Sequence, residues 1–214
     1  MDVLYLDSSM LVVNKPAGIP VLPDGWDADS PYLVRRLSDE YDRLWVVHRL
    51  DKATSGTLLL ARTAEAHRTL NLQFERRETE KVYHALVNGV PAWKEHTARH
   101  KLRVNVGHKH RTMVDHTRGK PAETAFKVLQ RFADCALLEC RPTTGRTHQI
   151  RVHAYALGHP LLGDSLYSAP PTDIIPRPAL HALHLTISHP ESGEWMTFEA
   201  PYPEDFAAAL HKLG

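Results

Sequence analysis

Apolar residues in this chain come in short runs separated by polar turns, a pattern typical of strands in a sheet. Within Lys81 to Val87 the apolar and polar positions alternate, so that Tyr83, Ala85 and Val87 fall on one face. Runs of this kind predict strands at 3–6, 11–14, 44–47, 57–61, 81–87, 123–132, 135–141, 182–188 and 194–199. We expect these strands to pair mainly as antiparallel neighbours.

A second pattern, with apolar residues three or four positions apart, predicts helices between some of the strands. Ser30 is expected to cap the first helix, with Pro31 at its first position and a buried stripe from Tyr32 to Tyr41. Thr63 is expected to cap the second. Two more helices are predicted at 147–157, with Gly158 as its C-terminal cap, and from Pro203 as a short closing helix. Helices among neighbouring strands favour a mixed α+β fold over a βαβ repeat.

Composition and charge say less about the fold and the function than the pattern of apolar residues does. The 214 residues are 43% apolar, enough for one substantial core, so we expect a single domain over 1–214. The net charge of +1 gives no sign of a nucleic-acid partner for the whole chain. From Arg99 to Lys120, however, seven Lys and Arg accompany one acid, Asp115. This basic tract 99–120 either attracts phosphates or is a solvated, mobile loop; both readings stay open.

The cysteines, the histidines and the lack of targeting signals in the sequence argue against a disulfide-bonded, secreted, membrane-spanning or metal-binding protein. Cys135 and Cys140 lie five positions apart on a predicted strand, so their side chains should face opposite ways and form no disulfide. We find no signal peptide and no apolar run of membrane-spanning length, so a cytoplasmic protein without a membrane partner is expected. The densest histidines, at 96, 100, 108 and 110, have no cysteine nearby, and no glycine-rich nucleotide loop occurs. We therefore expect no metal and no cofactor.

The most informative string is His48-Arg49-Leu50-Asp51-Lys52-Ala53-Thr54-Ser55-Gly56, a polar loop between two apolar runs. Each residue alone is typical of a surface turn. As a string, His-Arg-Leu-Asp-x-x-Thr-Ser-Gly closely resembles the catalytic loop of the RluA-type RNA pseudouridine synthases. Further blocks resemble the same family in the same order, from Val3 to Phe206: Asn14 to Gly18, Lys81-x-Tyr83, Gly145-Arg146-Thr147-His148-Gln149-Ile150-Arg151-Val152-His153, and Gly158 to Tyr167.

The resemblance implies the pseudouridine synthase fold, with a catalytic cleft, and assigns roles to residues. Asp51 would be the catalytic carboxylate, and Tyr83 would stack on the target base and help to move its carbon 5 proton. Arg146 is predicted at a helix start, where a cation is unfavourable unless an anion lies near, and Asp51 is the candidate. Arg49 would fill the gap left by the flipped base. The same strings supply the other expected RNA contacts: His48, Thr54, Lys81, His148 and Arg151.

The sequence departs from many relatives at its start. They carry a small N-terminal RNA-binding domain, whereas the first strand here is predicted at Val3, which leaves no room for one. We therefore expect a short, monomeric, single-domain member that modifies ribosomal or transfer RNA. The alternatives are an RNA-binding module that has lost catalysis, a nucleosidase that uses Asp51 on a ribose carbon, and a metal-dependent nuclease that uses the histidines.

Overall fold

The computed structural model describes residues 1–23, 31–107 and 111–214. Ser30, His108 and His110 lie outside the described residues. The chain forms two compact units, Met1–Lys81 with Ala182–Pro203 and Val82–His181 with Glu204–Gly214. We call them unit 1 and unit 2; the expectation of a single domain stays a prediction. None of the described helices is long and apolar enough to cross a membrane.

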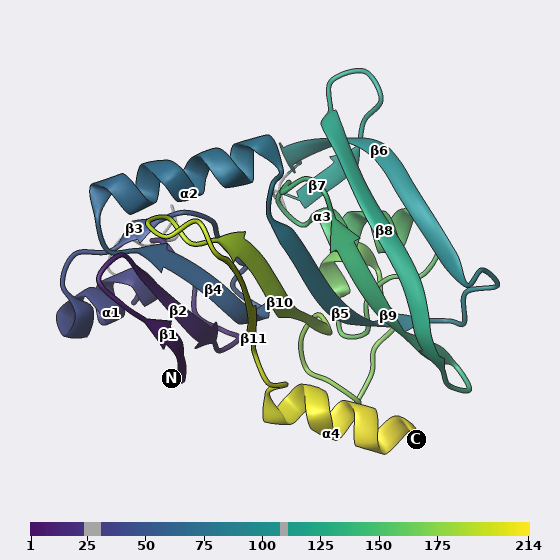
Figure 1. Cartoon of the computed structure of the whole chain (residues 1–214). Coiled ribbons are helices and arrows are strands. Elements are labelled where there is room, and N and C mark those ends of the chain that lie inside the picture. The colour runs from purple at the N-terminus through teal and green to yellow at the C-terminus, as the bar shows by residue number, and fades with distance from the viewer. Residues whose placement is uncertain (24–30, 108–110) are drawn as a thin grey trace. The chain divides into compact units, whose positions relative to one another are not determined.

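Unit 1 contains a sheet in the order β1-β2-β4-β10, with β3 paired to β4 and β11 paired to β10 (Figure 1). The strand pairs β1–β2, β2–β4, β3–β4 and β10–β11 are all antiparallel. Two helices, α1 and α2, complete it. The bounds are β1 Val3–Leu6, β2 Met10–Lys15, α1 Leu33–Tyr41, β3 Trp45–Val46, β4 Ser55–Ala61, α2 Ala64–Arg76, β10 Leu180–Ser188 and β11 Trp195–Glu199, with the first two residues of β10 belonging to unit 2.

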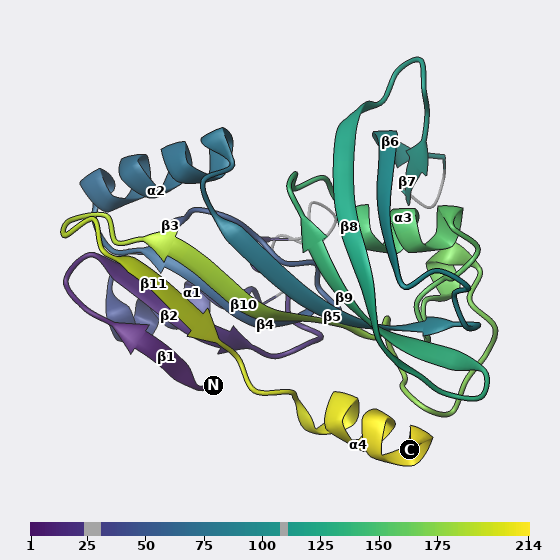
Figure 2. The ribbon, with the colours of Figure 1, turned by 45° about the vertical axis from the view of Figure 1, so that its right-hand side comes forward.

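The core of unit 1 lies where α2 runs along one face of this sheet (Figure 2). Alternate residues of β2, β4 and β10 point at Ala66 and Leu70 of α2, as the period of a strand requires. Thr63 caps α2 as predicted, because its hydroxyl accepts the Ala66 N–H at 3.1 Å.

The predicted start of α1 is wrong by two residues. Tyr32 is the N-cap, with extended backbone, and Pro31 stands outside the helix. The first two N–H groups of α1 are satisfied by a neighbouring segment: Leu33 donates to the Pro20 carbonyl at 2.8 Å and Val34 to the Val21 carbonyl at 3.2 Å. A side-chain cap is therefore not needed there.

Unit 2 holds an antiparallel sheet in the order β5-β9-β8-β6-β7 (Figure 1). Helix α3 packs against this sheet and supplies Ile150 and Ala154 to the core between them. The bounds are β5 Glu80–Asn88, whose first two residues belong to unit 1, β6 Glu95–Val106, β7 Arg111–Val114, β8 Lys120–Arg131, β9 Cys135–Pro142, α3 Gln149–Ala156, the short 3-10 helix η1 Ser165–Tyr167, and α4 Glu204–Leu213.

Strand alternation in unit 2 agrees with the sequence. Tyr83 packs against the core cluster that contains Ala85 and Val87, as predicted. Cys140 belongs to this cluster and Cys135 does not, so the two thiols point to opposite faces of β9. Gly158 ends α3 in the left-handed region, at φ +83°, and donates to the Tyr155 carbonyl.

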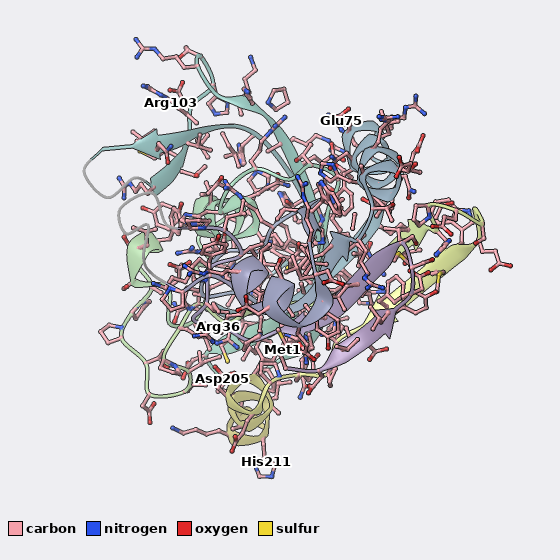
Figure 3. All side chains as sticks on the ribbon, turned by 90° about the vertical axis from the view of Figure 1, so that its left-hand side faces the viewer. Met1, Arg36, Glu75, Arg103, Asp205 and His211 are labelled. Atoms are coloured by element: carbon pink, nitrogen blue, oxygen red, sulfur yellow. The ribbon has the colours of Figure 1, made fainter. Side chains whose placement is uncertain are left out.

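The basic tract 99–120 is mostly a hairpin of β6 and β7, and the reading of a mobile loop is wrong for its described residues. Along β6, Ala98 and Leu102 are buried while Arg99, Lys101 and Arg103 are exposed. Arg103 is labelled in Figure 3. The strand was missed because its exposed face carries charges that also suit a loop. Whether this tract attracts phosphates stays a prediction.

Candidate active site

Asp51 lies on the loop between β3 and β4 in unit 1. Leu50 and Thr54 on either side of it are buried, at 6% and 2% exposed, whereas Asp51 itself is partly exposed. The Thr54 N–H donates to the Asp51 carbonyl at 3.0 Å and closes a tight turn. The loop is thus fixed by its buried residues and presents the carboxylate at the surface. The burial of Thr54 argues against its predicted contact with RNA.

A buried lysine holds this loop in place. Lys15, at the end of β2, is 0% exposed, and its Nζ donates to the carbonyls of Thr54 at 2.8 Å, Pro16 at 2.9 Å and Lys52 at 3.3 Å. The Gly18 N–H donates to the same Lys52 carbonyl at 2.8 Å. An ammonium has three donors and no acceptor, which suits a site made of carbonyls. Sequence reasoning assigned Lys15 no role, although a lysine that ends an apolar strand was the available signal.

Gly56 explains why this loop ends in glycine. Its φ is +116°, and a Cβ at this position would collide with the backbone of Ala182 on β10. Beside it the Thr57 hydroxyl donates to the Leu183 carbonyl at 3.1 Å. The chain therefore approaches its neighbour too closely for any side chain immediately after the Asp51 loop.

His48 supports the loop from within unit 1. Its Nε2 accepts the Leu59 N–H at 3.0 Å, and its ring stacks on Phe74 with centroids 4.8 Å apart. Burial, and secondarily Lys81, lowers the pKa of His48 to about 3, so the ring is neutral. Lys81 lies over the same Phe74 ring at 5.9 Å, and burial followed by Arg77 lowers its pKa. These contacts give His48 a structural role within unit 1, and its predicted contact with RNA stays a prediction. Arg49 is exposed.

In unit 2, Tyr83 and Arg146 come from two different elements. Tyr83 is partly buried on β5, directly opposite Cys140 of β9. Arg146 lies in the turn after β9, and α3 begins only at Gln149, so the prediction of a helix start at Thr147 and the argument from the helix dipole were wrong. The Arg146 Nε donates to the Pro121 carbonyl at 3.4 Å. The described residues of unit 2 offer its terminal nitrogens no hydrogen-bond partner.

The Arg146 turn is organised by the buried amide of Gln149. Its Oε1 accepts the Thr144 hydroxyl at 2.6 Å and the Arg146 N–H at 3.1 Å. Its Nε2 donates to the Glu123 carbonyl at 2.8 Å and to the Thr124 hydroxyl at 2.9 Å. One side chain therefore ties the turn to β8 and satisfies four polar groups. Gln149 is part of a motif in the sequence analysis, but the sequence does not reveal that its side chain bonds to β8.

His148 and Arg151 meet at Tyr167. The Tyr167 hydroxyl donates to the Thr112 carbonyl at 3.1 Å and accepts the Thr112 N–H at 3.0 Å, so its only proton is in use. The His148 Nδ1, 3.0 Å from the same oxygen, must then be the donor. Arg151 is 6% exposed, forms two bonds with Asp164 at 2.6 and 2.8 Å, and lies over the Tyr167 ring. This burial and pairing argue against the predicted contact of Arg151 with RNA.

No described group of three or more His, Cys, Asp or Glu residues could hold a metal ion. Of the densest histidines, His100 contacts two histidines outside that group: its ring centroid lies 5.9 Å from that of His116 and 5.6 Å from that of His153, both edge to face. The chemistry that the two units offer is therefore a surface carboxylate in unit 1, and a tyrosine and an arginine in unit 2.

Comparison with known proteins identifies the reaction. The model of the RNA pseudouridylate synthase family matches residues 9–156. The chain belongs to this family. Like its relatives, this RNA pseudouridine synthase isomerises uridine in RNA to pseudouridine, and its mixed α+β fold is that of the family.

The relatives of this pseudouridine synthase include bacterial and human proteins. It is 41% identical to the dual-specificity RNA pseudouridine synthase RluA of Escherichia coli K12, over 93% of this chain and 92% of that protein. It is 37% identical to the ribosomal large subunit pseudouridine synthase D of Neisseria meningitidis, over 100% of this chain and 61% of that one. The solved structure of human RNA pseudouridylate synthase domain containing 1 has a TM-score of 0.79 and 30% identity, over 94% of this chain and 83% of that one.

Proposed function

We propose that this enzyme converts specific uridines of ribosomal or transfer RNA to pseudouridine, with Asp51 as the catalytic carboxylate. The observation that carries the proposal is the Asp51 loop: a partly exposed carboxylate on a backbone fixed by Lys15 and closed by the Thr54 turn. Such a loop presents a charged group without needing to reorganise during the reaction. The names of the relatives, a dual-specificity enzyme and a ribosomal one, support both classes of RNA.

The reaction is an isomerisation within one nucleotide. The bond from ribose C1′ to uracil N1 breaks, a bond from C1′ to C5 forms, and the proton on C5 is finally replaced by one on N1. No atom is gained or lost, so no oxidant, energy carrier or second substrate is needed. The enzyme must supply an ionised carboxylate and hold the detached base.

Two residues of unit 2 complete the proposed site. Arg146 would pair with Asp51 and orient it, and the Arg146 Nε bond to the Pro121 carbonyl, which leaves the terminal nitrogens without a partner among the described residues of unit 2, supports that role. Tyr83 would stack on the uracil and move the C5 proton.

A uridine in a stem or loop must leave its stack to reach Asp51, at a cost of about a few kcal/mol. Arg49, exposed and two positions before Asp51, would fill the gap, since a planar guanidinium can stack on bases and bind phosphate. Because Arg49→Ala removes this support, it should slow turnover far more on a structured transcript than on an unpaired strand. Equal losses on both RNAs would exclude the role. The enzyme would act in the cytoplasm as a monomer.

The decisive experiment compares the wild type with Asp51→Asn on unmodified ribosomal and transfer RNA transcripts, without added metal or nucleotide. After digestion to nucleosides, chromatography separates pseudouridine from uridine. We expect pseudouridine from the wild type and none from the variant. Free uracil with abasic RNA would instead indicate a hydrolase, and RNA binding without any product would indicate a binding module.

A further inference from the structure

A groove lies beside the Asp51 loop and belongs wholly to unit 1. Its volume is ≈ 320 Å³, and its lining includes Pro16, Gly18, Pro20, Arg36 and Lys52. We propose that this groove binds a backbone phosphate of the RNA strand next to the target uridine. The proposal rests on the function proposed for Asp51, because it is the flipped uridine that brings the flanking phosphate here.

The charge of the groove favours an anion. Arg36 and Lys52 are both exposed, and none of the described residues that line the groove is acidic. Among the described residues, neither cation has an acidic side chain within salt-bridge distance. Arg36 is labelled in Figure 3, on α1. Two cations without an acidic partner beside one cavity are suited to a phosphate.

The groove is also rigid, because its walls are bonded to one another. The Lys52 carbonyl accepts bonds from the Gly18 N–H at 2.8 Å and from the Lys15 Nζ at 3.3 Å, which joins the Asp51 loop to the segment after β2. The Leu33 N–H donates to the Pro20 carbonyl at 2.8 Å and joins α1 to the same segment. A phosphate would therefore meet walls that need little ordering on binding.

The lining favours a backbone phosphate over a base. Within the part of the chain that the structure describes, the groove lining has no aromatic side chain on which a base could stack, and its uncharged lining residues are proline, alanine, glycine and isoleucine. Lys52 directly follows Asp51, so a nucleotide held at Asp51 places its neighbouring phosphates close to Lys52. Such a contact would fix the register of the strand without reading its sequence.

Salt-dependent binding tests the proposal. In an Asp51→Asn background, where no turnover occurs, the double variant Arg36→Ala with Lys52→Ala is titrated with a transcript that the wild type modifies. Loss of one phosphate contact should flatten the slope of log affinity against log salt by about 0.7 to 1 and weaken binding about tenfold at low salt. The matched control is Arg35→Ala, an exposed arginine of the same helix that does not line the groove, which should keep the wild-type slope.

A neutral methylphosphonate at either phosphate flanking the target uridine sharpens the test. On one of these two RNAs, the double variant should bind as tightly as it binds the unmodified RNA. The Asp51→Asn parent should lose about as much affinity from that methylphosphonate as it loses from the double substitution. An unchanged salt slope, or full additivity at both phosphates, would overturn the proposal. Denaturant unfolding confirms that the variants are folded. The binding measurement needs no turnover, so it tests the phosphate contact separately from the proposed reaction. Failure of the proposed reaction would appear as no pseudouridine from the wild type.

Discussion

The Asp51 loop in unit 1 and the Arg146 turn in unit 2 are each held by one buried side chain, but the two side chains differ in charge. Lys15 holds the Asp51 loop with an ammonium that donates to three backbone carbonyls. Gln149 holds the Arg146 turn with a neutral amide that contacts donors on one side and acceptors on the other. A cation therefore supports the loop that carries a carboxylate, and a neutral amide supports the turn that carries a cation. The comparison suggests that the acid loop is the more sensitive of the two, since losing a charged donor costs more than losing a neutral one.

The largest effect is expected from Lys15→Met, which keeps the length of the side chain and removes the three donors. The carbonyls of Thr54 and Pro16 would lose the Lys15 donor, whereas the Lys52 carbonyl would keep the Gly18 N–H; the expected cost is about 2 to 4 kcal/mol in the free energy of unfolding. Movement of the loop by about 1 Å should lower turnover about a hundredfold. Denaturant unfolding and pseudouridine formation measure both effects. Lys94→Met, at an exposed lysine, is the control and should change neither. Wild-type turnover in Lys15→Met would show that the ammonium does not position the loop.

A smaller effect is expected from Gln149→Leu in unit 2. The Arg146 N–H and the Thr144 hydroxyl would lose their acceptor, whereas Thr124 keeps His153 and the Glu123 carbonyl keeps the Thr143 N–H. We expect a loss of about 2 kcal/mol in the free energy of unfolding and a fall of about tenfold in kcat, with KM changed less. Steady-state kinetics and denaturant unfolding test this, with Gln130→Leu at an exposed site as the control. If Gln149→Leu costs more activity than Lys15→Met, the ranking of the two supports is reversed.

The smallest expected effect is on the pH dependence of the free energy of unfolding, to which each unit contributes one histidine of lowered pKa. The pKa of His48 in unit 1 is lowered to about 3, and that of His153 in unit 2, through burial and then His100, to about 4. An unfolded histidine titrates near 6.5, so below that pH the unfolded chain binds more protons and each histidine lowers stability by at most about 1.4 kcal/mol per pH unit. This loss continues down to about pH 3 for His48 and ends near pH 4 for His153.

Unfolding curves measured from pH 7 to pH 3 should therefore separate the two histidines. His48→Gln, whose amide oxygen can still accept the Leu59 N–H, should flatten the decline over the whole range, whereas His153→Gln should flatten it only above about pH 4. Parallel behaviour of both variants between pH 4 and pH 3 would contradict the lower pKa of His48. An unchanged slope in His48→Gln would show that this histidine is not held neutral.

The sequence predicted the parts of the fold whose signals are local. The Thr63 cap and the alternation along β5 depend on residues a few positions apart, and both are confirmed. The start of α1 was wrong because its first N–H groups bond to carbonyls of Pro20 and Val21, and a search for side-chain caps cannot see such partners. The β6–β7 hairpin was missed because a charged outer face looks alike on a strand and in a loop.

For the candidate site, too, the sequence revealed local signals and missed contacts between distant residues. Asp51 stood out because its neighbours form a recognisable string, and the chain belongs to the family that the string resembled. The roles of Lys15 and Gln149 depend on partners far along the chain, Thr54 and Thr124, and no spacing reveals them. Arg151 and Thr54 share motifs with the expected catalytic residues, but their burial and the Arg151–Asp164 pair are properties of the packed structure. Membership of a motif therefore did not distinguish residues that face the substrate from those that support them.

Because unit 1 is made from two segments that lie a hundred residues apart in the chain, Met1–Lys81 and Ala182–Pro203, the order of synthesis matters for the Asp51 loop. The core that contains Leu59 and Leu70 also needs Leu185, Ile187 and Phe198, and Gly56 lies against the backbone of Ala182. A ribosome that has translated as far as His181 has already made every proposed catalytic residue, but not the strands that complete the sheet behind Asp51. We therefore expect the sheet of unit 1 to be complete, with Gly56 in place against Ala182, only after β10 and β11 have been synthesised.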